Sequence, residues 1–262
     1  MTNFARDFEK MPGHWVLATL GKKVLRPGGL ELTRYMLDSL KITEKDSVVE
    51  FAPGIGVTAN MTLQRKPYQY IGVEQNEAAA ASVRSYLTGE RRDCIVGNAE
   101  NTGLESGVAS IIYGEAMLTM QSAKQKRNII AEAKRVLRPG GKYAIHEMCL
   151  APDDLADDIK ERIQKDLSVA IRVNARPLTI TEWKEQLEEQ GFIVTDIKTA
   201  PMHLLRPKRM IQDEGLLGVL RIASNVIRNP KARKRVLNMR SNFMKYEEYI
   251  QGVTIVAVLP EK

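Results

Sequence analysis

The sequence predicts an α/β fold, with a Rossmann-like, doubly wound and mostly parallel sheet that carries helices on both faces. Strand and helix patterns alternate from residue 30 to residue 148, which is typical of parallel strands joined by helical crossovers. A glycine-containing turn directly follows the first strand of this series. Because ligands of such sheets bind at the carboxyl ends of the strands, we expect the functional site there.

Each core element follows from a local pattern. Residues 30–40 (LELTRYMLDSL) place apolar side chains at helical spacing, and residues 47–52 (SVVEFA) form a short apolar run typical of a buried strand. The helix expected at 123–137 runs into RPGG, a helix stop followed by a turn. The other expected core elements are helices at 58–65 and 76–88 and strands at 68–73, 93–96, 109–113 and 142–148.

The pattern changes after residue 148. Charged helical stretches are expected at 152–173 and 181–190, followed by strands at 192–200 and 249–259. The segment between these strands is too long for an irregular loop, so it is expected to be helical. We treat residues 1–262 as a single domain, divided into an N-terminal helical cap (1–42), a core (43–150), a helical segment (151–191) and a last part (192–262) with a basic helical insertion at 205–245.

The formal net charge of +7 lies entirely in the last quarter of the chain. Residues 1–200 contain 27 basic and 27 acidic side chains, whereas residues 201–262 contain 12 and 5. Within this part, 213–228 has a broad apolar face that includes Leu216, Leu217 and Leu220. We expect these leucines to face inward as a lid over the site; a core helix, a contact with an anionic membrane through 205–240 and a plain solvated surface are the alternatives.

Composition excludes several classes of protein. A mean hydropathy of −0.27 and the absence of an 18-residue apolar stretch argue against a membrane-spanning protein. Two cysteines and three scattered histidines predict neither a disulfide scaffold nor a metal site. The charged start of the chain lacks an apolar signal core, so we expect a cytoplasmic location.

The turn after the first strand has the chemistry of a nucleotide-binding loop. Gly54 and Gly56 allow a tight turn with close backbone approach to a ligand, and Glu74 ends the second strand, where an acid can bind ribose hydroxyls. Gly54-x-Gly56-x-x-Ala59 also satisfies the dinucleotide fingerprint. Glu50 argues against that reading, because an acid four residues before Gly54 suits a cationic amino group better than a pyrophosphate.

With these flanks the chain resembles the class I S-adenosylmethionine-dependent methyltransferases, in the small-molecule branch of methyltransferase type 11 that includes ubiquinone/menaquinone methyltransferase-like enzymes. The resemblance covers about residues 45–148. It is carried by Glu50-x-Ala52-x-Gly54-x-Gly56, by Glu74, by Gly97-Asn98-Ala99-Glu100 and by the RVLRPGG segment at 135–141. It implies a sheet of seven strands with helical lid insertions, and S-adenosyl-L-methionine as the cofactor.

The resemblance also implies the cofactor-binding residues, which are Glu50, Ala52, Gly54, Gly56, Glu74, Gln75, Asn98, Ala99 and Gly114. Two of them depart from the family pattern. Ala52 replaces the first glycine of the motif, which the fold tolerates if that residue does not adopt a positive φ. Asn98 replaces an aspartate, but its amide oxygen can still accept a hydrogen bond from the adenine amino group.

Glu115 and His146 are the candidate catalytic residues. Glu115 follows the fourth strand, where a carboxylate can attract a cationic amine or act as a general base, and His146 closes the fifth strand and can accept a substrate proton. The alternatives are a solvent-exposed loop acid and a hydrogen-bonded strand-end histidine. His14 and Trp15 lie in a segment that can cover the site, and their rings can face a sulfonium or pack in the core.

We therefore predict a methyltransferase that transfers a methyl group to a small-molecule acceptor by in-line displacement at the sulfonium. Residues 1–30, 151–178 and 203–245 are expected to form the acceptor pocket. The basic last quarter favours an RNA methyltransferase as an alternative, but the Asn/Asp-Pro-Pro-aromatic motif is missing after the fourth strand. A non-catalytic cofactor-binding or membrane-associated protein and a nicotinamide dehydrogenase are further alternatives, and the oligomeric state is left open.

Overall fold

The computed structural model describes residues 8–261, so residues 1–7 of the expected N-terminal cap lie outside the described part. Its centre is one sheet with the strand order β3-β2-β1-β4-β5-β8-β7, and a short β6 pairs with β5. The strands are β1 (Ser47–Phe51), β2 (Gln69–Glu74), β3 (Arg92–Val96), β4 (Ala109–Glu115), β5 (Leu137–Leu150), β6 (Leu178–Thr179), β7 (Ile193–Pro201) and β8 (Ile250–Val258).

The sheet is mostly parallel, as predicted. β1 pairs in parallel with β2 and β4, β2 with β3, and β4 with β5, whereas β8 is antiparallel to both β5 and β7. The helices are α1 (Gly13–Thr19), α2 (Gly29–Leu40), α3 (Val57–Leu63), α4 (Glu77–Arg84), α5 (Ala123–Val136), α6 (Asp157–Ile171), α7 (Ile180–Glu188), α8 (Pro207–Arg228) and α9 (Pro230–Lys245), with a 3-10 turn η1 (Leu118–Met120). The two-residue β6 has no strand pattern of its own.

Helices cover both faces of the sheet because successive strand residues point to opposite sides. On β1, Val48 packs in a cluster with α2, α3 and α4, and the next residue, Val49, packs in a second cluster with α5 and α7. Trp183 of α7 is fully buried in the second cluster, and its indole N–H donates to the backbone oxygen of Met148 at 3.0 Å. The sheet is therefore a rigid base for the loops at its carboxyl edge.

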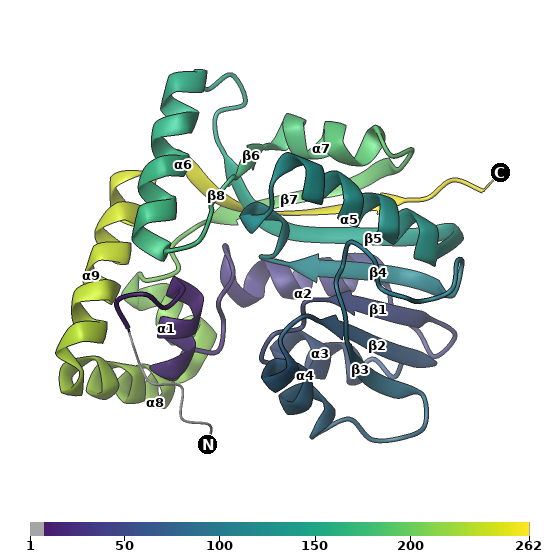
Figure 1. Cartoon of the computed structure of the whole chain (residues 1–262), viewed down its shortest axis with the longest axis horizontal. Helices are drawn as coiled ribbons and strands as arrows, with labels where there is room; N and C mark the ends of the chain where they lie inside the picture. The colour runs from purple at the N-terminus through teal and green to yellow at the C-terminus, as the bar shows by residue number, and fades with distance from the viewer. Residues whose placement is uncertain (1–7, 262) are drawn as a thin grey trace.

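A separate group of helices lies beyond that edge. Figure 1 shows α1, α6, α8 and α9 gathered at one end of the sheet, and they share a third apolar cluster with the end of β5. The contacts are close: a Cβ on Gly13 of α1 would lie 2.7 Å from the sulfur of Met239 on α9. We call α1, α6, α8 and α9 the helical cap; of these, only α1 lies within the N-terminal cap expected at residues 1–42. None of the helices in the described part of the chain has the length and apolarity to cross a bilayer.

The prediction that Leu216, Leu217 and Leu220 face inward is wrong. Their exposed fractions are 63%, 81% and 57%, whereas Ile222 on the other side of α8 is buried. Gly215 interrupts the helix with φ 71° and ψ 165°, so the second half of α8 is rotated relative to the first. The helical pattern of the sequence identified an apolar face correctly, but we expected this face to pack against the protein, whereas it faces solvent.

Candidate active site

A cavity of about 570 Å³ lies between the carboxyl edge of the sheet and the helical cap. One half is lined by residues that follow β1, β2, β3 and β4, and the other half by residues of α1, α9 and the end of α6. The loops after β1 and β4 leave the sheet at the point where the strand order reverses direction, which is where doubly wound sheets bind their ligands.

The turn after β1 adopts left-handed backbone conformations. Ala52 has φ 54°, Gly54 φ 57° and Gly56 φ 78°. The condition under which we expected Ala52 to be tolerated, a negative φ, is therefore not met, and this residue carries strain that a glycine would avoid. Gly56 has a second reason to be glycine, because a Cβ there would overlap the hydroxyl of Tyr86, which donates to the Gly56 carbonyl at 3.0 Å.

Glu50 lies at the end of β1 with only 3% of its surface exposed, and it contributes to the cavity wall. Its Oε2 accepts hydrogen bonds from the hydroxyls of Tyr70 and Tyr113, both at 2.7 Å. Among the described residues no hydrogen bond reaches Oε1. Burial raises the pKa of Glu50 to about 7, although the two tyrosine hydroxyls act in the opposite direction. A cationic ligand group in the cavity would favour the charged form of this carboxylate.

Glu74 is held by backbone N–H groups. Its Oε2 accepts from Gly54 N and its Oε1 from Asn76 N, both at 2.9 Å, so the glycine turn and the start of α4 fix the carboxylate together. Each carboxylate oxygen has a second lone pair for a further donor. The side chain lines the cavity, and this arrangement fits a bidentate interaction with a ribose diol.

Gln75, Asn98 and Ala99 also line the cavity. Asn98 Oδ1 accepts from Glu100 N at 2.9 Å, which uses one of the two lone pairs that this oxygen offers. Of the other predicted cofactor residues, Gly56 and Gly114 do not line the cavity. Gly114 is buried, with Phe51 and Met117 beside it, and the wall at this position is made by Glu115 and Ala116 instead.

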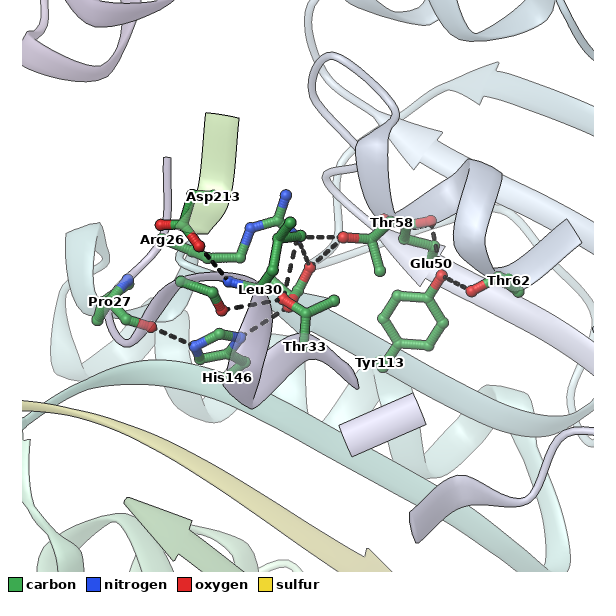
Figure 2. Close-up of polar contacts among 12 residues, drawn as sticks. Arg26, Pro27, Leu30, Thr33, Glu50, Thr58, Thr62, Tyr113, His146 and Asp213 are labelled. Carbon is green, nitrogen blue, oxygen red and sulfur yellow. Dashed lines mark hydrogen bonds and ion pairs between the residues drawn. The ribbon is translucent and has the colours of Figure 1, made fainter. Parts of the chain in front are cut away.

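Glu115 is the centre of a buried polar cluster rather than an exposed loop acid. Arg26 and Thr58 donate to Oε2, Thr33 Oγ1 donates to Oε1 at 2.7 Å, and His146 Nδ1 lies 2.7 Å from Oε1. Figure 2 shows Arg26, Thr33, Thr58 and His146 close together around these bonds. Burial alone would raise the pKa of Glu115. The charge of Arg26 and the bonds from His146 and Thr33 outweigh burial and hold this pKa well below its ordinary range.

His146 is fully buried, does not line the cavity, and has an oxygen acceptor beside each ring nitrogen. Nδ1 faces the Glu115 carboxylate and Nε2 faces the carbonyl oxygen of Pro27. Both ring nitrogens are therefore occupied by oxygen atoms of the protein. Neither faces the cavity, so His146 is not placed to take a proton from an acceptor.

The family model described as a methyltransferase domain matches residues 49–145. A protein of Haemophilus influenzae, itself uncharacterized, is 34% identical over 247 residues, which cover 93% of this chain and 96% of the relative. This chain is a class I S-adenosylmethionine-dependent methyltransferase of type 11. Its cofactor is S-adenosyl-L-methionine, which the residues described above fit.

Solved structures share the fold of this methyltransferase at low identity. Phosphoethanolamine N-methyltransferase 2 of Haemonchus contortus, in complex with phosphomonomethylethanolamine and S-adenosylhomocysteine, is 17% identical with a TM-score of 0.69. The match covers 95% of this chain but only 57% of that protein. Geranyl diphosphate methyltransferase is 16% identical (TM-score 0.63; 87% and 78% covered), and the [4+2]-cyclase SpnF is 15% identical (TM-score 0.68; 88% and 82% covered). Since these proteins share one fold but are named for different reactions, a similar fold does not identify the acceptor of this chain.

The second half of the methyltransferase cavity is mostly apolar. The residues outside the core that line it include Trp15, Leu17, Leu25, Ile171, Val173, Met202, Leu204, Met239 and Phe243. They come from the segments predicted for the acceptor pocket, except Met202, which lies one residue before the last of them. His14 lines the same half, and no hydrogen bond in the described part of the chain involves its ring nitrogens; its ring lies 5.3 Å from that of Trp15. Burial lowers the pKa of His14, so its imidazole is neutral at pH 7.

Sequence reasoning missed two parts of the methyltransferase site. The first is the attachment to the sheet of segment 26–29, which we call the strap: His146 bonds to Pro27, and the Pro27 carbonyl carbon would lie 2.7 Å from a Cβ on Gly252 of β8. The second is Glu147, whose buried carboxylate accepts from three consecutive backbone N–H groups, of residues 117–119, at 2.7–3.0 Å. Both depend on partners about 30 or more residues away, so no local pattern could have found them.

Proposed function

We propose that this methyltransferase transfers a methyl group to a small acceptor with a largely apolar body. The observation that carries the proposal is the apolar half of the cavity, which continues directly from the residues that fit the cofactor. The whole cavity, at about 570 Å³, has the volume of a small-molecule site rather than of a nucleic-acid groove. When bound, S-adenosylmethionine supplies an electrophilic methyl group on a positively charged sulfur.

In this proposal three polar groups hold the cofactor. The free oxygen of Glu50 faces the ammonium group of the methionine moiety, and a charge-assisted hydrogen bond there compensates the cost of a buried carboxylate. Glu74 accepts from both ribose hydroxyls, and the second lone pair of Asn98 Oδ1 accepts from the adenine amino group. Such fixed contacts orient the reacting carbon, which accounts for much of the rate in a displacement between two bound partners.

Glu115 and His146 act as positioning residues in this proposal. Arg26 neutralises Glu115, and His146 ties that carboxylate to the strap through Pro27, so the two side chains keep the wall of the cavity in place. The neutral imidazole of His14 is the better candidate to accept a proton, because it lines the apolar half and no described residue bonds to its ring nitrogens. An acceptor that reacts without losing a proton needs no base at all.

The test is a search for a methylated product. The purified protein is incubated with cofactor carrying an isotopically labelled methyl group and a low-molecular-weight cell extract, and mass spectrometry identifies compounds that gain one labelled CH₂ unit. We expect a labelled, mostly apolar product that disappears with Glu74→Ala. Label incorporation into total RNA, with none in small molecules, would instead support the nucleic-acid alternative.

A further inference from the structure

We propose that the outer face of α8, together with the cationic side chains of α8 and α9, binds a membrane surface rich in anionic lipids. Large apolar side chains stand in water along this helix: Leu216 is 63% exposed, Leu217 81%, Leu220 57% and Ile227 68%. Leu216, Leu220 and Ile227 occupy positions i, i+4 and i+11, which lie on one stripe of a helix. This proposal does not rest on the proposed acceptor.

The rest of α8 is firmly attached to the protein, so the stripe is a fixed surface. Asp213 accepts from Leu30 N at 3.0 Å, and Glu214 accepts from Lys22 Nζ at 3.2 Å and from Val24 N at 2.9 Å. Beyond the kink at Gly215, Ile222 is buried, and Asn225 Nδ2 donates to the carbonyl oxygen of Leu20 at 3.0 Å. The inner side of the helix is thereby bonded to the rest of the protein, whereas no described residue covers the apolar stripe.

The charge of α8 and α9 indicates which partner fits the exposed face of α8. The two acids of α8, Asp213 and Glu214, accept hydrogen bonds from backbone N–H groups of residues 24 and 30. Residues 215–246 contain no acidic side chain. The same residues contain eight basic side chains, of which six are exposed: Arg221, Arg228, Lys231, Arg233, Lys234 and Lys245. An exposed apolar stripe bordered by arginine and lysine is the pattern of a helix that lies in the interface of an anionic bilayer.

Two other partners, an RNA and a second copy of this chain, fit this face less well than a membrane does. An RNA backbone would pair with the cations but would leave four large apolar side chains in contact with a charged polymer. A second copy of the chain would cover the leucines but would bring two strongly cationic faces together, and like charges oppose association. A lipid surface satisfies both the apolar and the cationic side chains. Figure 1 shows α8 and α9 at the end of the molecule opposite the C-terminus, where such a surface can approach them.

The experiment is flotation of the whole protein with vesicles of phosphatidylcholine alone or with about 30 mol % phosphatidylglycerol. We expect flotation with the anionic vesicles only. Leu216→Ser with Leu220→Ser should lower the partition coefficient about tenfold, whereas Val169→Ser with Ile193→Ser, which removes exposed apolar side chains elsewhere, should not. Arg221→Gln with Arg228→Gln should also weaken binding, and the equal charge change Arg127→Gln with Lys184→Gln should have a much smaller effect.

Binding of S-adenosylhomocysteine, measured by calorimetry, checks that each variant is folded and keeps this test separate from the methyltransferase reaction. Three results would overturn the proposal. These are no flotation of the wild-type protein, equal flotation with neutral vesicles, and a dimer in light scattering that Leu216→Ser with Leu220→Ser dissociates while vesicle binding is absent. RNA binding that is lost in the arginine pair but kept in the leucine pair would assign the face to nucleic acid.

Discussion

Glu50 keeps a buried carboxylate beside the cavity, and the proposed contact with an ammonium group couples its protonation to ligand binding. With a pKa of about 7 it is largely protonated below that pH, and it must ionise to pair with an ammonium group. Between pH 7 and pH 5.5 we therefore expect the affinity for S-adenosylhomocysteine to fall by roughly 15-fold, with release of about one proton on binding at the lower pH. Calorimetry in two buffers of different ionisation enthalpy measures both quantities.

The control for this prediction is Glu50→Gln, which should bind weakly with no pH dependence in the same range. The stability of the free protein provides a second readout. Since the pKa is raised in the folded state, the stabilising effect of the protonated acid is complete below pH 4.5 and is lost as the pH rises to about 7. The melting temperature of the wild type should fall over that window relative to Glu50→Gln. A pH-independent affinity would remove Glu50 from the ammonium site.

Ala52 offers a test of backbone strain at a single residue. It has φ 54°, a conformation that costs an L-residue roughly 1–2 kcal/mol and a glycine almost nothing. Ala52→Gly should therefore increase the free energy of unfolding by about 1 kcal/mol despite the greater freedom of glycine in the unfolded chain. Urea denaturation measures the difference. The matched control is Ala81→Gly on the exposed side of α4, which should lower stability by about 1 kcal/mol.

At the scale of elements, the strap and the sheet are fitted to each other. Gly252 of β8 leaves no space for a side chain, because its Cβ would lie 2.7 Å from Pro27 C and 2.8 Å from Gly28 N. Gly252→Ala should push the strap away from β5, weaken the bond between His146 and Pro27, and cost about 1–3 kcal/mol of stability.

Chemical denaturation and the dissociation constant for S-adenosylhomocysteine measure the two effects of Gly252→Ala. Gln251→Ala changes the neighbouring position, whose side chain points to the opposite face of the strand, and should leave both quantities near their wild-type values. Unchanged values in Gly252→Ala as well would show that the strap adapts freely and that His146 does not hold it.

At the scale of the whole molecule, the cavity joins two bodies of structure. One wall belongs to the sheet and the other to the helical cap, so a ligand that touches both stabilises the entire chain. At a hundred times its dissociation constant, S-adenosylhomocysteine should add about 2.7 kcal/mol and raise the melting temperature by roughly 5–10 °C. NAD should produce no shift. Thermal unfolding followed by circular dichroism checks both, and stabilisation by NAD alone would contradict the assignment of the cofactor.

The sequence by itself determined the order and type of nearly all elements, the glycine turn, and seven cofactor-binding candidates that line the cavity, out of nine predicted, including Glu50 and Glu74. These features could be predicted because their signals are local: a residue's neighbours within a few positions decide whether it is helix, strand or turn. The family could be predicted for the same reason, since its motifs are short segments that follow particular strands.

Only the tertiary structure decided which residues distant in the sequence come into contact. Glu115 bonds to Arg26, which is 89 positions away in the chain, and to His146, which is 31 positions away. These contacts place both candidate bases, Glu115 and His146, in a buried polar cluster. The kink at Gly215 and the inward bonds of Glu214 determined which side of α8 is buried. Helical periodicity shows that a helix has two faces, but the side that meets the protein depends on the surface against which the helix packs, and that surface is built by residues far away in the sequence.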